Sequence, residues 1–176
     1  MRLLYIVSMV AALASAPATA AAQAKKARPA QGHEEHERAE ARERKDKAAA
    51  GRKIEITAGD DMKYSVTSII AKPGETLHIV LENVGVVPKV AMAHNLIVLN
   101  AGVDGKEFSL EAMLARDTEY VPAARKADIV ASTGLAGPGE TVEVTFKAPA
   151  KVGAYPFVCT FPTHFSAGMK GELTVK

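Results

Sequence analysis

The sequence predicts an all-β protein, a Greek-key β-sandwich of about eight strands, and three features of residues 53–176 support this prediction. Apolar and polar residues alternate with a period of two in short segments, as in strands with one buried face. Turn signals such as Pro73-Gly74 separate the segments. The length fits one domain, which typically takes roughly 100 to 150 residues. We expect a short helical insertion within the sandwich and two further segments in front of it.

The first of these segments, residues 1–24, has the pattern of a secretory signal peptide. Arg2 provides a positive start, an apolar stretch follows, and Ala18-Thr19-Ala20 is a small-residue cleavage site. The apolar stretch is shorter than the roughly 20 residues that a membrane-spanning helix needs. We therefore expect a mature protein in the bacterial periplasm, without a stable membrane anchor.

The second segment, residues 25–52, is a charged, low-complexity spacer. It holds nine Lys and Arg against six Asp and Glu, and it contains no Leu, Ile, Val or aromatic residue. Such a composition offers no apolar face to bury, so the spacer is expected to be disordered or partly helical. Glu40 and Arg44 are one of its acid-first pairs at helical spacing. His33 and His36 could weakly chelate a divalent metal, but a solvated tail is the better interpretation.

The predicted domain is mildly acidic, because residues 53–176 carry twelve Lys and Arg against fourteen Asp and Glu. A phosphate-binding surface would concentrate basic side chains on the fold itself. Nucleic acid is therefore not an expected partner. The single cysteine, Cys159, cannot form an intramolecular disulfide, so it is a free thiol, an intermolecular partner or a metal ligand.

Alternation in the N-terminal half of the domain predicts the first strands and their buried faces. Leu77 and Ile79 face inward in one strand, which places His78 on the opposite face as an ordinary surface histidine. A further strand is expected over residues 95–100, which are apolar at their centre. The other inward positions predicted here are Ile54, Ile56, Met62, Tyr64, Val66 and Leu81.

The expected helix lies between these strands and the C-terminal ones. Ser109 is a candidate N-cap, and Phe108 and Met113 are placed to form a hydrophobic staple, so the helix is predicted to end near Leu114. The strand pattern then returns. The inward positions predicted in the C-terminal strands are Ile129, Val130, Val142, Val144, Phe146, Tyr155, Phe157, Cys159, Met169, Leu173 and Val175.

The segment 159–169 brings three potential metal ligands close together in sequence: the thiol of Cys159, the imidazole of His164 and the thioether of Met169. One cysteine and two histidines with a long axial methionine make the blue-copper electron-transfer arrangement. The second histidine is expected to be His94, sixty-five residues before Cys159, at the start of a strand. Taken alone, each of these residues has an ordinary structural role, and it is their joint occurrence that indicates a metal site.

With these residues in place, the domain resembles azurin, a bacterial member of the small blue copper proteins, or cupredoxins. The likeness covers essentially all of residues 53–176, including the helical insertion near residues 106–121. The matching motifs are Met92-Ala93-His94-Asn95, Cys159-Thr160-Phe161-Pro162-Thr163-His164, Met169-Lys170-Gly171 and Asp61-Met62-Lys63-Tyr64. The resemblance implies a cupredoxin sandwich that holds one mononuclear type 1 copper ion.

The resemblance also implies a role for each residue of the site. His94, Cys159 and His164 correspond to the three strong copper ligands of the family, and Met169 corresponds to the axial ligand. The carbonyl of Ala93 corresponds to a weak backbone contact.

The residues next to the ligands match the family as well. Asn95 and Thr160 match the pair that ties the two ligand loops together and holds the thiolate. The azurin pattern has three residues between its last histidine and its methionine, whereas four separate His164 from Met169 here. His164 is expected to expose a ring edge within an apolar docking patch. The patch members implied by the resemblance are Met62, Val87, Met92, Phe161 and Phe165.

These features predict a monomeric periplasmic carrier of single electrons, with c-type cytochromes or periplasmic reductases and oxidases as redox partners. A copper chaperone or storage protein is the alternative, and it would favour an open site that exchanges its metal. An enzyme is less compatible with the sequence. Copper enzymes built on this fold need further histidines, often as His-x-His pairs, and the sequence has none. Cys159 acting as a nucleophile with His164 as its base would lack an orienting acid nearby.

Overall fold

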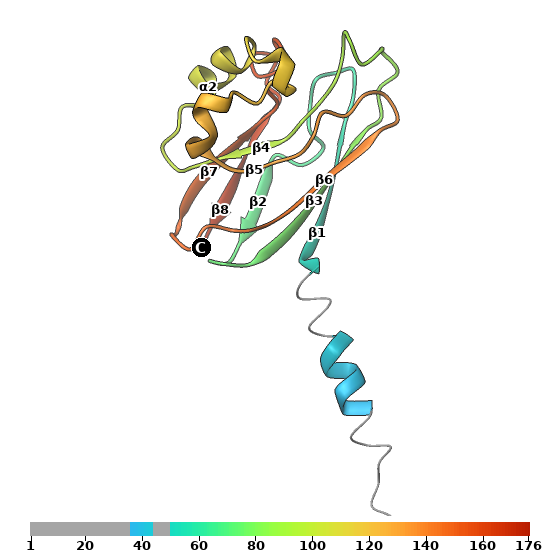
Figure 1. Ribbon diagram of the computed structural model, residues 1–176, viewed down its shortest axis with the longest axis vertical. Helices are drawn as coiled ribbons and strands as arrows, with labels where there is room; N and C mark the ends of the chain where they lie inside the picture. The colour runs from blue at the N-terminus through green and yellow to red at the C-terminus, as the bar shows by residue number, and fades with distance from the viewer. Residues whose placement is uncertain (1–35, 44–49) are drawn as a thin grey trace, which may run out of the picture.

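The computed structural model describes residues 36–43 and 50–176. Eight strands in these residues form two sheets that pack face to face (Figure 1), as the sequence predicted. Residues 36–43 are helical, as expected for part of the spacer, whereas the predicted signal peptide lies outside the described residues. No helix in the described part of the chain is long and apolar enough to cross a membrane.

The first sheet has three strands in the order β1-β3-β6, with β3 in the centre. Its members are β1 (Arg52–Ala58), parallel to β3 (Thr76–Asn83), and β6 (Thr141–Lys147), antiparallel to β3. Leu77, Ile79 and Leu81 are each 0% exposed, which confirms the predicted inward face of β3. His78 lies on the other face, where its Nε2 is 2.9 Å from a carboxylate oxygen of Glu143.

The second sheet has five strands in the order β2-β8-β7-β4-β5. Its members are β2 (Ser68–Ala71), β8 (Lys170–Val175), β7 (Gly153–Val158), β4 (Ile97–Leu99) and β5 (Ile129–Ser132). The apolar run that contains β4 is fully buried, because this strand lies between β5 and β7 and is covered on both faces. Tyr155 and Phe157 of β7 and Leu173 and Val175 of β8 face the core, as predicted.

The segment 59–67 differs from its prediction as a strand. A turn interrupts it, in which the N–H of Met62 donates to the carbonyl of Gly59 (2.9 Å) and Met62 has a φ of 56°. Tyr64 forms only an isolated bridge with Ala58. The predicted face is nevertheless correct, since Tyr64 is buried while Lys63 and Ser65 on either side of it are exposed. Alternation therefore predicted burial but not the hydrogen-bonding pattern.

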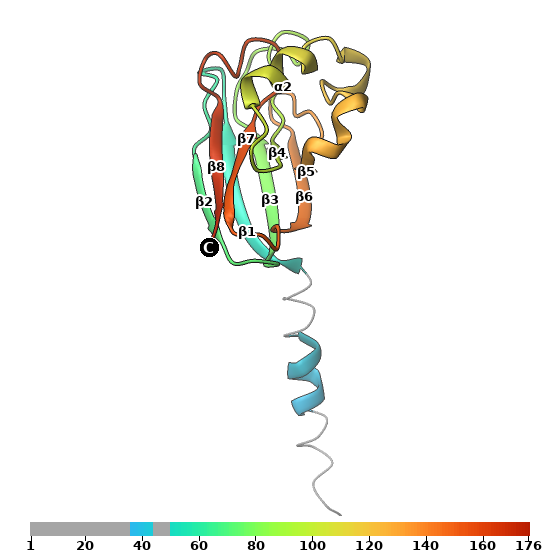
Figure 2. The ribbon, with the colours of Figure 1, turned by 90° about the vertical axis from the view of Figure 1, so that its left-hand side faces the viewer.

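The helical insertion follows β4 and packs beside one end of the five-stranded sheet (Figure 2). It comprises α2 (Gly105–Ala112) and two short 3₁₀ helices, η1 (Arg116–Thr118) and η2 (Ala123–Asp128). The predicted start is wrong, because the N-cap of α2 is Asp104, five residues before Ser109. The carboxylate of Asp104 accepts the N–H groups of Lys106 (2.8 Å) and Glu107 (3.1 Å) and so caps the helix. Ser109 and Phe108 are buried within α2 rather than acting as cap and staple.

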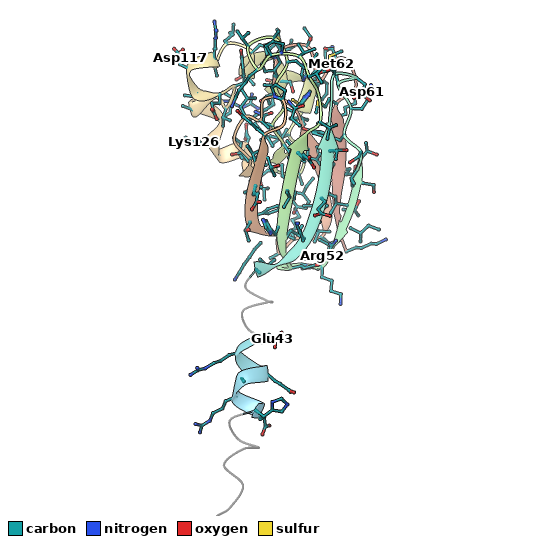
Figure 3. All side chains as sticks on the ribbon, turned by 90° about the vertical axis from the view of Figure 1, so that its right-hand side faces the viewer. Glu43, Arg52, Asp61, Met62, Asp117 and Lys126 are labelled. Carbon is teal, nitrogen blue, oxygen red and sulfur yellow. The ribbon has the colours of Figure 1, made fainter. Side chains whose placement is uncertain are left out.

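The loop between β7 and β8 and the turn at Met62 lie at the same end of the sandwich. Figure 2 shows this loop beside α2, and Figure 3 shows Met62 at the end opposite Arg52. All predicted metal ligands fall at or near this end. Cys159 directly follows β7 and Met169 directly precedes β8, and His94 lies close to the donor atoms of this loop.

Candidate metal centre

Main-chain pairing fixes His94 just before β4. Its N–H donates to the carbonyl of Ala136 (3.0 Å), and the N–H of Ala136 donates back to the carbonyl of His94 (2.8 Å). The side-chain amide of Asn83, at the end of β3, also donates to the carbonyl of Ala136 (3.1 Å). The first histidine is thus connected to both sheets of the sandwich.

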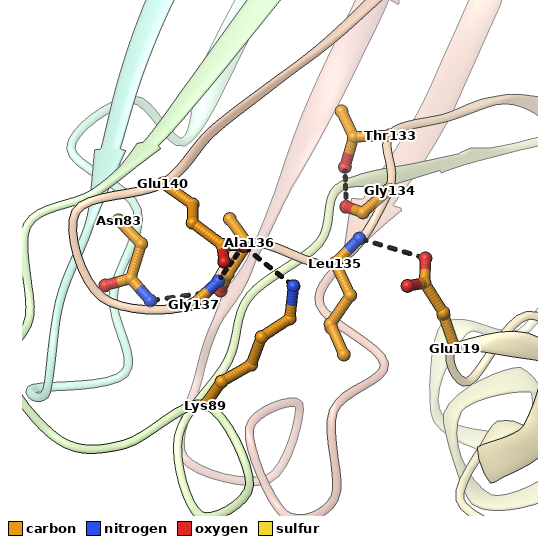
Figure 4. Close-up of polar contacts among 9 residues, drawn as sticks. All are labelled: Asn83, Lys89, Glu119, Thr133, Gly134, Leu135, Ala136, Gly137 and Glu140. Atoms are coloured by element: carbon orange, nitrogen blue, oxygen red, sulfur yellow. Dashed lines mark hydrogen bonds and ion pairs between the residues drawn. The ribbon is translucent and has the colours of Figure 1, made fainter.

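The segment that pairs with His94 is itself held in place, as Figure 4 shows. The carboxylate of Glu140 accepts the N–H of Gly137 (2.9 Å) and the ammonium of Lys89 (2.7 Å). This pair closes the turn that follows Ala136. The backbone around His94 therefore has little freedom to move away from the site.

The loop between β7 and β8 folds back on itself through main-chain hydrogen bonds. The N–H of Cys159 donates to the carbonyl of Met169 (3.1 Å), and the N–H of Met169 donates to the carbonyl of His164 (3.0 Å). The N–H of His164 in turn donates to the carbonyl of Phe161 (3.1 Å). These bonds bring the three candidate ligands of the loop together without any metal.

The side chains of His94, Cys159 and His164 converge. One donor atom from each lies within 4.8 Å of the others, and Sγ of Cys159 is 3.5 Å from Nδ1 of His164. The two imidazole rings are 4.9 Å apart at their centroids. This is the one such cluster of His, Cys, Asp and Glu within residues 36–43 and 50–176.

Burial of these donors makes a metal the natural partner. His94 and Cys159 are 0% exposed and His164 is 1% exposed. Neither ring nitrogen of His94 has a hydrogen-bond partner among the described residues. A buried polar atom without a partner is unfavourable by about 1 to 3 kcal/mol, and a metal ion would supply that partner. Imidazole, thiolate and thioether suit copper, and Met169 is fully buried and joined by backbone bonds to both Cys159 and His164.

Burial also determines the protonation of the candidate ligands. It raises the pKa of the Cys159 thiol to about 11, although the backbone groups of Asn95 and Phe161 act to lower this pKa. Burial, together with the nearby His94, lowers the pKa of His164 to about 4. Burial likewise lowers the pKa of His94. At neutral pH both imidazoles are therefore uncharged and offer lone pairs, while the thiol must lose its proton to a metal.

Asn95 and Thr160 connect the two ligand segments directly. The amide nitrogen of Asn95 donates to Oγ1 of Thr160 (2.8 Å), and the amide oxygen of Asn95 accepts the N–H of Thr160 (2.9 Å). Each residue directly follows a candidate ligand, and both are almost completely buried. The predicted contact between the two loops is present in the structure.

The predicted exposure of the His164 ring is wrong. Only 1% of this residue is exposed, because the ring of Phe161 lies 4.9 Å away and is itself only 7% exposed. Tyr120 from the helical insertion packs edge-on against Phe161 at 5.2 Å. Phe165 packs against the apolar cluster beneath α2. Met62, Val87 and Met92 are half-buried.

Two residues next to the site were not assigned a role from the sequence. The hydroxyl of Tyr64 donates to the carbonyl of Asn95 (2.5 Å), and the ammonium of Lys63 donates to the carbonyl of Ala167. Both contacts join positions far apart in the chain, so only the fold reveals them. For the Tyr64 contact, the one signal in the sequence was a tyrosine at an inward position of a strand-like segment, because the hydroxyl of a buried tyrosine needs a hydrogen-bond partner.

A two-sheet sandwich with a buried His, Cys, His and Met cluster at one end is typical of a type 1, or blue, copper protein. The comparison with known families agrees with this class. Residues 50–176 match the family of copper-binding proteins described as plastocyanin/azurin, and the chain belongs to this family. The family comprises electron-transfer cupredoxins, which are generally not enzymes.

Individual relatives support the same assignment. The chain is 33% identical over 132 residues to azurin of Pseudomonas denitrificans, covering 70% of this chain and 97% of the azurin. It is 32% identical over 126 residues to auracyanin-B of Chloroflexus aurantiacus, covering 69% of this chain and 51% of that protein. It thus spans about half the length of this second relative.

A solved structure shows the shared architecture. Auracyanin A of Chloroflexus aurantiacus, a "blue" copper protein, superposes with a TM-score of 0.63 at 33% identity. The match covers 70% of this chain and 98% of that structure.

Proposed function

We propose that this protein carries single electrons, with copper bound by His94, Cys159 and His164, by Met169 in the axial position, and weakly by the carbonyl of Ala93. The convergence of three buried donor atoms within 4.8 Å is the observation that carries the proposal. A bound copper ion supplies one-electron chemistry between Cu(I) and Cu(II). The residues hold fixed positions through the hydrogen bonds described above, so little rearrangement accompanies electron exchange.

Burial favours the carrier over the alternative of a copper chaperone or storage protein. A site that hands its metal to a partner needs at least one accessible ligand. Here Cys159 is 0% exposed and His164 is 1% exposed, behind Phe161. Release of copper would require the loop to open, whereas transfer of an electron would not.

We further propose that the protein works in the periplasm as a monomer and exchanges electrons with c-type cytochromes or periplasmic reductases and oxidases. The signal-peptide pattern of residues 1–24 supports this location. The half-buried Met62, Val87 and Met92 supply the apolar surface near the site that a brief encounter with a redox partner requires. The family resemblance assigns Phe161 and Phe165 to the same patch, although Phe161 is only 7% exposed.

The test is addition of Cu(II) to the purified mature protein. We expect an intense blue absorption from charge transfer between the thiolate and copper, at one ion per chain, which Cys159→Ser abolishes. Slow loss of copper to a chelator would separate the carrier from a chaperone, since rapid loss is the behaviour of a delivery site. A colourless complex would contradict the type 1 assignment.

A further inference from the structure

The loop between β7 and β8 ends in a turn that is bound by a side chain from a distant part of the chain. Within the turn, the N–H of Ala167 donates to the carbonyl of Thr163 (3.0 Å), and the N–H of Gly168 donates to the carbonyl of Phe165 (2.9 Å). The carbonyl of Ala167 accepts the ammonium of Lys63, which lies 104 positions earlier. Lysine side chains bind the free carbonyls at the end of a helical turn in this way.

Gly168 leaves room for this ammonium. Its φ is 97°, and a Cβ at this position would lie 2.7 Å from Nζ of Lys63. Glycine adopts such a φ without steric cost and presents no side chain to the approaching group. The ammonium therefore lies against the backbone of the residue that directly precedes Met169.

The segment that carries Lys63 is itself fixed to the sandwich. The hydroxyl of the next residue, Tyr64, donates to the carbonyl of Asn95 (2.5 Å). The N–H of Ser65 donates to the carbonyl of Thr57 in β1 (2.9 Å). Lys63 thus connects a loop of the five-stranded sheet to a segment anchored on the three-stranded sheet.

We propose that Lys63 is a positioning residue that holds this loop closed and so slows the release of copper. Cys159, His164 and Met169 all lie on the loop, so copper leaves only when the loop opens. Four residues separate His164 from Met169, one more than in the azurin pattern, and a longer loop has more conformations to restrain. The inference rests on the proposed function, because it requires copper at these residues.

The first test measures amide hydrogen exchange in the metal-free protein, so it does not depend on copper. Lys63→Met removes the ammonium of an exposed residue and keeps most of its aliphatic chain. The amides of Ala167, Gly168 and Met169 should then exchange about three- to tenfold faster, because one charge-assisted hydrogen bond of an exposed group no longer restrains opening of the turn. The amides at the centre of β3 should keep their rates.

Two further variants separate the hydrogen bond from the charge. Lys63→Arg keeps a cationic donor and should restore most of the protection. Lys106→Met removes the same charge from the other side of the loop, where Lys106 lines a pocket together with Thr163 and Ser166. This control should leave exchange in the turn unchanged.

The second test measures the rate at which an excess of chelator removes copper from the loaded protein. Lys63→Met should lose copper about three- to tenfold faster than the unsubstituted protein, and Lys106→Met should lose it at the original rate. A purely structural role would instead lower the overall stability and speed amide exchange in β3 as much as in the turn.

Unchanged exchange of the turn amides in Lys63→Met, or an equal acceleration in Lys106→Met, would overturn the inference. Faster exchange together with an unchanged rate of copper loss would overturn the role of Lys63 in retaining the metal. Failure of the proposed function looks different, because the unsubstituted protein would then not turn blue.

Discussion

Replacing Asn95 by alanine tests whether the two ligand loops are held together before any metal binds. The side chain of Asn95 forms two good hydrogen bonds with Thr160, at 2.8 and 2.9 Å, and both residues are at most 1% exposed. Loss of these bonds removes about 1 kcal/mol each, and the orphaned N–H of Thr160 adds about 1 kcal/mol or more. We expect the metal-free protein to lose about 3 kcal/mol of unfolding free energy.

The assay is urea denaturation of the metal-free protein, followed by circular dichroism. With an m-value of about 1.5 kcal/mol/M, the midpoint should fall by about 2 M. Asn100→Ala is the control, because the side chain of Asn100 donates a single bond, to the carbonyl of Ala127 (2.7 Å), at a half-buried position. The reasoning is refuted if Asn95→Ala destabilises the protein no more than Asn100→Ala.

Three further predictions concern the copper loop and its protonation. Thr163 has a φ of 71°, which is unfavourable for a β-branched residue. Thr163→Gly should therefore raise the unfolding free energy, measured by urea denaturation, by about 0.5 kcal/mol. Thr163→Ala keeps a Cβ and should not raise it. Binding of Cu(II) at pH 7 should release about one proton, from Cys159, because the pKa of the thiol is raised to about 11 while burial lowers the pKa of both His94 and His164. Calorimetry in buffers of different ionisation enthalpy measures this number, and a release of two or more protons at pH 7 would contradict uncharged imidazoles in the metal-free site. The lowered pKa of His164 also means that the unfolded chain binds a proton more readily than the folded one between about pH 6.5 and pH 4. The metal-free protein should therefore lose about 2 kcal/mol of unfolding free energy as the pH falls across this range. His164→Gln should reduce this loss in parallel urea titrations.

Much of the fold follows from local pattern. The alternation of Leu77, Ile79 and Leu81 predicted a buried face, and the structure confirms it, because a period of two leaves a strand in a sandwich only one way to bury its apolar side chains. The same signal placed Tyr64 inside but could not reveal the turn before it, where Met62 adopts a positive φ. The helix was predicted from Ser109, whereas Asp104 caps it; both residue types are good caps, and sequence alone did not choose between them.

The candidate site was predictable to a different degree in each of its parts. The donor types and their order indicated His94, Cys159, His164 and Met169 as candidate ligands, since few other chemistries use this combination. The burial of His164 was not predictable, because it depends on Phe161 and on a helical insertion whose position is set by tertiary packing.

The contact between Tyr64 and Asn95 was equally hidden in the sequence. It joins residues thirty-one positions apart, and no local pattern encodes such a bond. The proposed ligands could thus be selected from the sequence, whereas the contacts around them depend on the fold.

The most direct test of the central claim is a crystal structure of the copper-loaded protein with diffraction measured on both sides of the copper absorption edge. We expect a single anomalous peak between Sγ of Cys159 and one ring nitrogen each of His94 and His164, with the sulfur of Met169 farther away. The same crystals should change from blue to colourless on reduction without movement of the loop. Copper located anywhere else, such as at the histidines of the spacer, or a loop that opens on reduction, would contradict the account.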